Sequence, residues 1–155
     1  MPIDPDDLDL ATLVSLAGAA TDRWIIERLR AAGFDGIRVS HGYVIQRLIE
    51  TSPTIGELAM QLGVTQQAAS KTVVEMERLR LVERTADPTD SRVRRVSLTP
   101  HGRAVLDAGR AARREVDDSL DAVDLASTRR TLIALLDKTG GLDEVRGRRA
   151  RLPER

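Results

Sequence analysis

The stretch Thr54-Ile-Gly-Glu-Leu-Ala-Met-Gln-Leu-Gly-Val-Thr-Gln-Gln-Ala-Ala-Ser-Lys71 decides the fold. Thr54 and Glu57 have the spacing of a capping box, in which each side chain satisfies a backbone N–H group of the other residue at a helix start. We therefore expect a helix over residues 55–62, with Gly63 ending it. Thr65 can cap the next helix, over about residues 66–79. Two helices joined by such a short turn cross steeply, which predicts a helix-turn-helix.

The second helix of this pair has one apolar and one polar side. Ala69, Val73 and Met76 share a face because each residue turns the helix by about 100°. The opposite side presents Gln66, Gln67, Ser70, Lys71, Val74 and Arg78. Amide, hydroxyl and ammonium groups there can pair with base edges and phosphates in a DNA major groove. Taken alone, however, such a polar side is more often simply solvated.

A β-hairpin is predicted directly after the helix-turn-helix. Residues 81–85 and 92–98 have an extended pattern and flank Asp87-Pro-Thr-Asp90, a turn-forming set. The hairpin carries Arg92, Arg94 and Arg95 close together. Arginines on a protruding ribbon suit phosphates or a narrow minor groove, whereas the alternative is a salt-bridged hairpin that serves solubility.

Helices are also predicted on both sides of this central stretch. Apolar residues recur at three- and four-residue steps over about residues 8–32 and 40–51, and again over about residues 100–120 and 124–138. Thr99 and Pro100 supply the cap and the first-turn proline of the third of these helices. The expected fold class is mainly α with a small β-hairpin wing, arranged as a winged helix-turn-helix in one structural domain.

Composition fits a soluble globular protein and excludes several classes of function. The 155 residues are 41% hydrophobic and 31% charged, and no apolar run approaches the roughly 18 residues of a membrane span. The acidic N-terminus does not have the order of a secretory signal, so we expect a cytoplasmic location and no membrane partner. Without cysteine, the chain forms no disulfide, thiolate metal site or thiol redox sensor. The 24 basic residues balance 24 acidic ones, but residues 65–103 hold eight basic against five acidic residues.

Enzyme activity is not expected. The two histidines, His41 and His101, lie 60 residues apart, and the chain has no glycine-rich phosphate loop and no carboxylate pair at catalytic spacing. The histidines also have no further ligands at metal-binding spacing. We therefore expect no catalytic residue, no metal and no other cofactor.

Several segments together resemble the MarR family. They are Thr54-Ile-Gly-Glu-Leu-Ala, Gly63-Val-Thr-Gln-Gln-Ala-Ala-Ser-Lys, Leu81-Val-Glu-Arg, Asp87-Pro-Thr-Asp-Ser-Arg and Val96-Ser-Leu-Thr-Pro-His-Gly. The resemblance is close over about residues 54–102, and the flanking helices match in order and length. Its most specific mark is the aspartate, any residue, arginine pattern in the wing, followed by Leu-Thr and a glycine.

The resemblance implies a sequence-specific DNA-binding transcription regulator. The recognition helix would enter the major groove of a pseudo-palindromic operator in double-stranded DNA, and Asp90 would pair with and aim Arg92 into the minor groove. The predicted DNA-binding residues are Thr54, Thr65, Gln66, Gln67, Ser70, Lys71, Asp90, Arg92 and Arg94. Repression is the commoner mode in the family, and activation stays open. The alternative is a winged-helix protein-interaction module without specific DNA binding, against which Lys71, Arg92 and Arg94 argue.

The resemblance also implies a homodimer whose first and last helices intertwine. Residues 1–36 and 99–142 would then form a helical dimerisation region, residues 37–98 the winged helix-turn-helix DNA-binding lobe, and residues 143–155 a flexible tail. The alternative is that the apolar faces of the outer helices form only a core within one chain. The tail arginines could add phosphate contacts, although a solvated tail is the favoured interpretation.

Many relatives are released from DNA by a small aromatic or anionic effector bound between the dimer helices and the DNA-binding lobe. The residues predicted for such a pocket are Trp24, Arg28, His41 and Tyr43. The aromatic residues can equally be core, and His41 can equally be a helix-start residue. One position departs from the family, which usually has glycine where this chain has Arg80. If that position needs a left-handed backbone, arginine costs on the order of 1 kcal/mol, so the recognition helix could end differently here.

Overall fold

The computed structural model of the protein describes residues 4–120 and 124–142. The elements in chain order are a 3-10 helix η1 (Pro5–Asp7), α1 (Leu10–Ala31), α2 (Val39–Arg47), α3 (Ile55–Leu62), α4 (Gln66–Arg78), β1 (Val82–Ala86), β2 (Arg94–Leu98), α5 (Pro100–Asp118) and α6 (Leu125–Lys138). The predicted class, mainly α with one hairpin, is confirmed. Three details differ, because η1 was not expected, α2 ends at Arg47 rather than near residue 51, and β2 begins at Arg94 rather than at residue 92. The predicted tail, 143–155, lies outside the described residues.

The helix-turn-helix forms as the capping pattern predicts. The Glu57 N–H donates to Thr54 Oγ1 at 3.2 Å, and the Thr54 N–H donates to Glu57 Oε2 at 2.8 Å, which completes the capping box of α3. Gly63 ends α3 with a left-handed backbone, φ 67°. Thr65 then caps α4 by accepting a hydrogen bond from the Ala68 N–H at 3.1 Å. Local side-chain chemistry therefore sets both ends of the turn.

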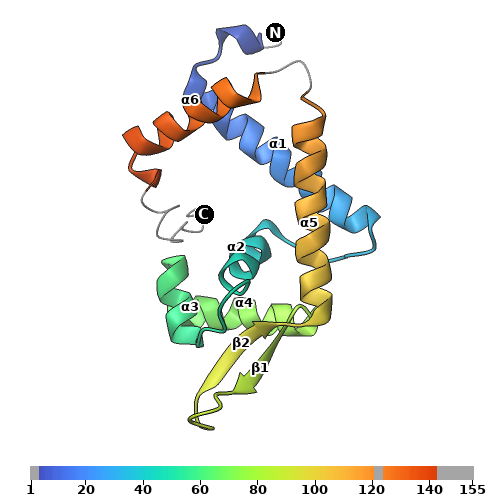
Figure 1. The fold of residues 1–155 in the computed structure, drawn as a ribbon, viewed down its shortest axis with the longest axis vertical. Coiled ribbons are helices and arrows are strands. Elements are labelled where there is room, and N and C mark those ends of the chain that lie inside the picture. Colours follow the sequence, from blue (N-terminus) through green and yellow to red (C-terminus); the bar gives the residue numbers. More distant parts are fainter. Residues whose placement is uncertain (1–3, 121–123, 143–155) are drawn as a thin grey trace.

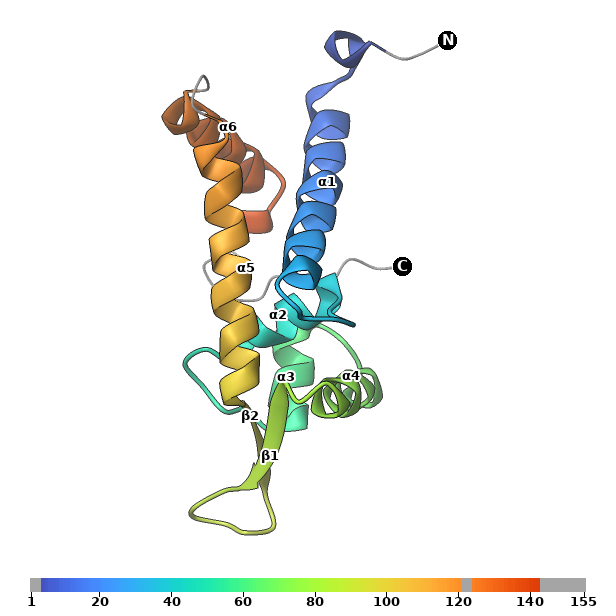
Figure 2. The ribbon, with the colours of Figure 1, turned by 90° about the vertical axis from the view of Figure 1, so that its right-hand side faces the viewer.

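The molecule has a compact lobe at one end and long helices at the other (Figure 1). The lobe comprises α2, α3, α4 and the antiparallel β1–β2 hairpin, whose register pairs Val82 with Leu98 and Ala86 with Arg94. From the base of the hairpin, α5 rises away from the lobe, and α1 packs beside it (Figure 2). Both α1, which leads into α2, and α5 thus connect the lobe to the long helices.

The core lies within the lobe and at its junction with α1 and α5. Its largest fully buried side chains are Val44, Leu58, Leu62, Val73, Met76, Leu81, Val96 and Val105, together with His41. By contrast, none of the α6 residues is buried, and the first half of α1 is exposed. The large apolar side chains left exposed there are Leu10, Leu13, Leu16, Leu132, Ile133 and Leu136, at 37–55%. One chain alone therefore leaves the apolar faces of its outer helices uncovered.

Gly102 fixes the corner where α5 leaves the hairpin. Its N–H donates to Thr99 Oγ1 at 3.0 Å, which caps α5, and the Thr99 N–H donates to the Leu81 carbonyl at 3.1 Å. A Cβ atom at Gly102 would lie 2.0 Å from that same Leu81 carbonyl oxygen. The start of α5 therefore packs directly against the backbone that leads into β1, and no side chain fits at this position.

Helix α4 ends in a left-handed turn at Arg80, with φ 57°. The Leu81 N–H donates to the Met76 carbonyl and the Arg80 N–H to the Glu77 carbonyl, both at 2.9 Å, as in a Schellman motif. Among the described residues, Arg80 is the one non-glycine residue with a positive φ. The suggestion that arginine makes the helix end differently is wrong, because arginine adopts the conformation that usually favours glycine.

Candidate nucleic-acid interface

The N-terminal half of α4 presents a polar face to solvent. Gln66, Gln67 and Lys71 are exposed and Ser70 is half-buried, whereas Ala69, Val73 and Met76 on the other side are at most 1% exposed. This confirms the predicted division of the helix. The polar face also borders a broad hollow, whose other lining residues are Arg38, Ile55, Val74, Glu75 and Arg78. The structure thus brings together four of the predicted DNA-binding residues on one surface.

Thr54 and Thr65 lie at the starts of α3 and α4. Each hydroxyl oxygen accepts a backbone N–H as a helix cap. A hydroxyl that accepts in this way still has its own hydrogen to donate. Both residues can therefore cap a helix and donate to a phosphate oxygen at the same time.

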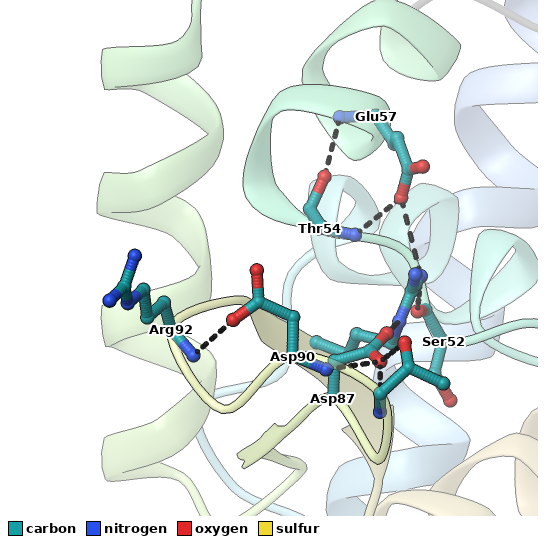
Figure 3. A network of polar contacts seen from close by, with 8 residues as sticks. Ser52, Thr54, Glu57, Asp87, Asp90 and Arg92 are labelled. Atoms are coloured by element: carbon teal, nitrogen blue, oxygen red, sulfur yellow. Dashed lines mark hydrogen bonds and ion pairs between the residues drawn. The ribbon is translucent and has the colours of Figure 1, made fainter.

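The wing loop between β1 and β2 projects beyond the rest of the lobe (Figure 1). Arg92 lies in this loop and Arg94 begins β2, and both are exposed. The contact between Asp90 and Arg92 differs from the expected one. The backbone N–H of Arg92 donates to Asp90 Oδ1 at 3.0 Å (Figure 3). Asp90 therefore shapes the loop that carries Arg92, and no contact of Asp90 with the guanidinium is seen among the described residues.

The third wing arginine, Arg95, is bound within the protein. Its Nε donates to Asp87 Oδ2, its Nη1 donates to the Ser52 carbonyl at 3.1 Å, and Nη1 also lies 3.6 Å from Glu57 Oε2. Arg95 thus forms salt bridges within the protein, which is the alternative considered for the hairpin arginines in the sequence. Sequence reasoning grouped the three arginines together, because it could not tell which of them faces another element.

Asp87 is a buried carboxylate that sequence reasoning treated only as a turn residue. It is 8% exposed, and its Oδ1 accepts from the Thr89 N–H at 2.8 Å, the Thr89 hydroxyl at 2.5 Å and the Asp90 N–H at 3.3 Å. These bonds from Thr89, together with Arg95, hold the pKa of Asp87 well below its usual range. The signal for this role was the Asp-Pro-Thr order, in which an aspartate can bond the backbone two residues on.

A second polar cluster joins the start of α2 to α4. Arg38 pairs with Glu75 of α4 through Nη2 and Oε1 at 2.9 Å, and the Arg38 N–H donates to His41 Nδ1 at 3.2 Å. His41 is fully buried, with Nε2 3.6 Å from Glu75 Oε2. Burial lowers the pKa of His41, against the opposing effect of Glu75. His41 thus lies in the first turn of α2, as the helix-start interpretation predicts.

The structure gives different neighbours to the four residues predicted for an effector pocket. The Arg28 guanidinium lies 4.3 Å from the Trp24 ring centroid, and its Nε pairs with Glu115 of α5 at 3.0 Å. Tyr43 is half-buried and packs against the core. Helical spacing gives the face of a residue but not its neighbour across elements, so these residues could not be sorted from sequence.

An apolar hollow nevertheless lies between α1, α2 and α5. Its apolar walls are Ile25, Ile26, Leu29, Ile37, Val39, Ile45, Val105 and Leu106. Arg38, Arg113, Asp22 and Gln46 supply its polar groups, and none of the four predicted pocket residues lines it. Sequence reasoning missed Arg38 and Arg113, because a lone arginine in a charged sequence gives no signal.

Neither a membrane span nor a metal-binding cluster is found in the part of the chain that the structure describes. Over residues 4–120 and 124–142, no helix is long and apolar enough to cross a membrane. Over the same ranges, no three histidine, aspartate or glutamate side chains come together in a way that could hold a metal ion.

Comparison with known proteins gives a family-model match and similar solved structures. Residues 36–93 match the model of the MarR family, and the sequence matches no curated protein. Similar solved structures include an S. aureus MepR–DNA complex, with a TM-score of 0.66 at 18% identity, covering 88% of this chain and 100% of that one. E. coli MarR in its reduced form has a TM-score of 0.64 at 24% identity, covering 83% and 97%. BldR from Sulfolobus solfataricus has a TM-score of 0.59 at 24% identity, covering 89% and 99%. The central lobe, residues 36–93, thus matches the MarR family model, and the chain shares the fold of these solved structures along most of its length.

Proposed function

We propose that this protein is a sequence-specific DNA-binding transcription regulator that acts as a repressor. The observation that carries the proposal is the pairing, on one lobe, of the polar N-terminal face of α4 with an exposed arginine wing. A helix of this kind fits the major groove, where Gln66 and Gln67 would meet base edges and Lys71 a phosphate. The S. aureus MepR structure of the same fold is a complex with DNA, which supports the assignment.

The wing is proposed to contact the neighbouring minor groove. Arg92 and Arg94 are exposed, and the hairpin that carries them forms the end of the lobe farthest from the long helices (Figure 1). A narrow minor groove has an enhanced negative potential that attracts arginine. Because the whole chain has no net charge, these side chains with Lys71 and Arg78 would supply the local positive field that DNA binding needs.

The regulator is proposed to work as a homodimer on a pseudo-palindromic operator. The exposed apolar residues of α1 and α6 would be covered by the same residues of a second copy. Two recognition helices related by a two-fold axis read two half-sites about 34 Å apart on one side of the duplex. Such a dimer on a promoter would block polymerase, and DNA binding would require the cytoplasmic location expected from the sequence.

A small aromatic or anionic effector is proposed to release the DNA. The hollow between α1, α2 and α5 has apolar walls and two arginines, Arg38 and Arg113, which suit a flat apolar body with a negative group. Arg38 also pairs with Glu75 of α4, so a ligand that drew Arg38 away would change the contacts of the recognition helix. The proposed effector site therefore contains none of the four residues predicted from the sequence, Trp24, Arg28, His41 and Tyr43. A ligand role for those four residues stays a prediction.

Fluorescence anisotropy with labelled promoter and random duplexes at two salt concentrations tests DNA binding. We expect selective, salt-sensitive binding, and a loss of affinity for all duplexes with Arg92→Ala. The slope of log affinity against log salt should fall by about 0.9 per lost phosphate contact, or roughly two per dimer. Arg110→Ala, which removes an equal charge from α5, is the control and should bind normally. If the wild type binds no duplex, or binds all of them alike, a winged helix that binds another protein becomes the better account. If the wild type binds selectively and Arg92→Ala binds like it, the wing has no part in the interface.

A further inference from the structure

We propose that Arg95 is a positioning residue, which with Asp87 and Glu57 clamps the wing to the start of α3 and thereby sets the position of Arg92. The proposal rests on the proposed DNA-binding function, because the wing matters for affinity only if it meets DNA. It separates Arg95 from Arg92 and Arg94, its neighbours in sequence, by giving it no contact with DNA.

Arg95 joins three separate segments. Its guanidinium reaches Asp87 at the start of the wing loop, the Ser52 carbonyl in the α2–α3 connection, and Glu57 in the first turn of α3. The adjacent backbone follows the same path, since the Val96 N–H donates to the Pro53 carbonyl at 2.9 Å. The wing is therefore fastened to the helix-turn-helix at two neighbouring points of β2.

Asp87 connects Arg95 to the wing loop. One carboxylate oxygen binds Arg95, while the other accepts hydrogen bonds from Thr89 and from the Asp90 N–H. The loop is closed by hydrogen bonds from the Asp87 N–H to the Val93 carbonyl and from the Val93 N–H to the Asp90 carbonyl. Asp90 in turn accepts the Arg92 N–H. A continuous chain of contacts thus runs from α3 to the backbone of Arg92.

The charges around Arg95 disfavour an interaction with phosphate. Arg95 is flanked by two carboxylates, those of Asp87 and Glu57, so the three side chains together carry a net charge of minus one. A group with this charge does not attract phosphate. Because the pKa of Asp87 is well below its usual range, the carboxylate stays ionised throughout the physiological range of pH. Direct phosphate binding by Arg95 is therefore disfavoured, and holding the wing is the role that its contacts support.

The substitution Asp87→Asn distinguishes a positioning role of the Arg95 cluster from a simple effect of its charge on DNA binding. This substitution removes a negative charge near the DNA, which by simple electrostatics would strengthen binding. The clamp predicts the opposite, a loss of affinity of about tenfold or more, because a neutral amide holds Arg95 weakly. Arg95→Ala should lose a similar amount, and the double variant no more than either alone, as expected for one unit. Asp107→Asn, which makes the same charge change in an exposed ion pair on α5, is the control and should not weaken binding.

A double variant tests whether Asp87 acts through Arg92, and the melting temperature of each variant excludes a general loss of structure. In the Asp87→Asn background, Arg92→Ala should reduce affinity much less than it does in the wild type, because Arg92 is already misplaced. Glu57→Gln is a milder variant, because glutamine can still complete the capping box of α3 while losing the ion pair to Arg95. It should weaken DNA binding with a small change in melting temperature, and it keeps the test available if Asp87→Asn folds poorly.

Trypsin cleavage of the free protein after Arg92 and Arg94 tests the clamp without DNA. The clamp predicts faster cleavage there in Asp87→Asn and Glu57→Gln than in the wild type and Asp107→Asn. Unchanged cleavage, or equal or tighter DNA binding by Asp87→Asn, would overturn the proposal. If no form of the protein bound DNA while cleavage changed as expected, the clamp would stand and the proposed DNA-binding function would fail.

Discussion

At the scale of single residues, Arg80 shows a local conflict between sequence and backbone. The turn after α4 needs a left-handed conformation, and arginine adopts it at φ 57°. A non-glycine residue loses roughly 1–2 kcal/mol in this region, and glycine recovers only part of that because its unfolded chain is more flexible. Arg80→Gly should therefore stabilise the protein by about 0.5–1 kcal/mol in urea unfolding. Arg80→Ala keeps the strained backbone and is the matched control, and equal gains from both variants would contradict the explanation.

His41 is the residue that should make stability depend on pH near neutrality. Its Nδ1 accepts the Arg38 N–H, so the neutral ring carries its proton on Nε2, within 3.6 Å of Glu75. Burial lowers the folded-state pKa below the ordinary value of 6.5, so the unfolded chain takes up a proton first as the pH falls. The free energy of unfolding should thus be highest above about pH 6.5 and decrease below it.

The test is urea unfolding of the wild type and His41→Gln at pH values of about 7.5, 6.5 and 5.5, which span the ordinary histidine pKa. His41→Gln should be less stable at the highest pH but should show a weaker decrease toward the lowest. His101→Gln, which changes an exposed histidine, should keep the wild-type dependence. A His41→Gln profile parallel to that of the wild type would assign the pH dependence to other groups.

At the scale of elements, the junction of hairpin and α5 depends on the absence of a side chain at Gly102. A Cβ atom there would lie 2.0 Å from the Leu81 carbonyl oxygen, which belongs to backbone and cannot turn aside. Gly102→Ala should therefore destabilise the protein by about 1–3 kcal/mol or more in thermal or urea unfolding. A Cβ atom at Gly42 in α2 would have no neighbouring atom within 4 Å, so Gly42→Ala is the control and should stabilise by up to about 1 kcal/mol. If Gly102→Ala left the stability of the protein unchanged, the corner between the hairpin and α5 would be loosely packed.

The elements themselves were largely predictable because their signals are local. Thr54 with Glu57, and Thr65, act within one helical turn, and the structure has the α3 and α4 boundaries that they indicate. Contacts across elements were not predictable. The pairing of Arg95 with Glu57 joins residues 38 positions apart, and neither charge stands out among its neighbours in sequence. The same reason explains why the four predicted pocket residues did not include Arg38 or Arg113 of the apolar hollow.

At the scale of the whole molecule, the exposed apolar faces of α1 and α6 predict self-association. Leu132→Asp places a charge among Leu132, Ile133 and Leu136, which are 37–51% exposed in one chain. If a second copy covers these residues, the substitution should weaken the dimer at least about tenfold, as measured by analytical ultracentrifugation over a range of concentrations. Lys138→Glu changes a charge on another side of α6 and is the control. A wild-type chain that sediments as a monomer at high concentration would contradict the dimer.

The central claim is that α4 and the wing read DNA sequence, and selection from a random duplex pool tests it most directly. The protein is mixed with the pool, bound duplexes are recovered over several rounds, and the recovered sequences are read. The account predicts enrichment of a pseudo-palindrome with half-sites about one helical turn apart, and for Gln67→Ala a relaxed preference at one base position of each half-site. Recovery of duplexes without any enriched sequence, or of none at all, would contradict it.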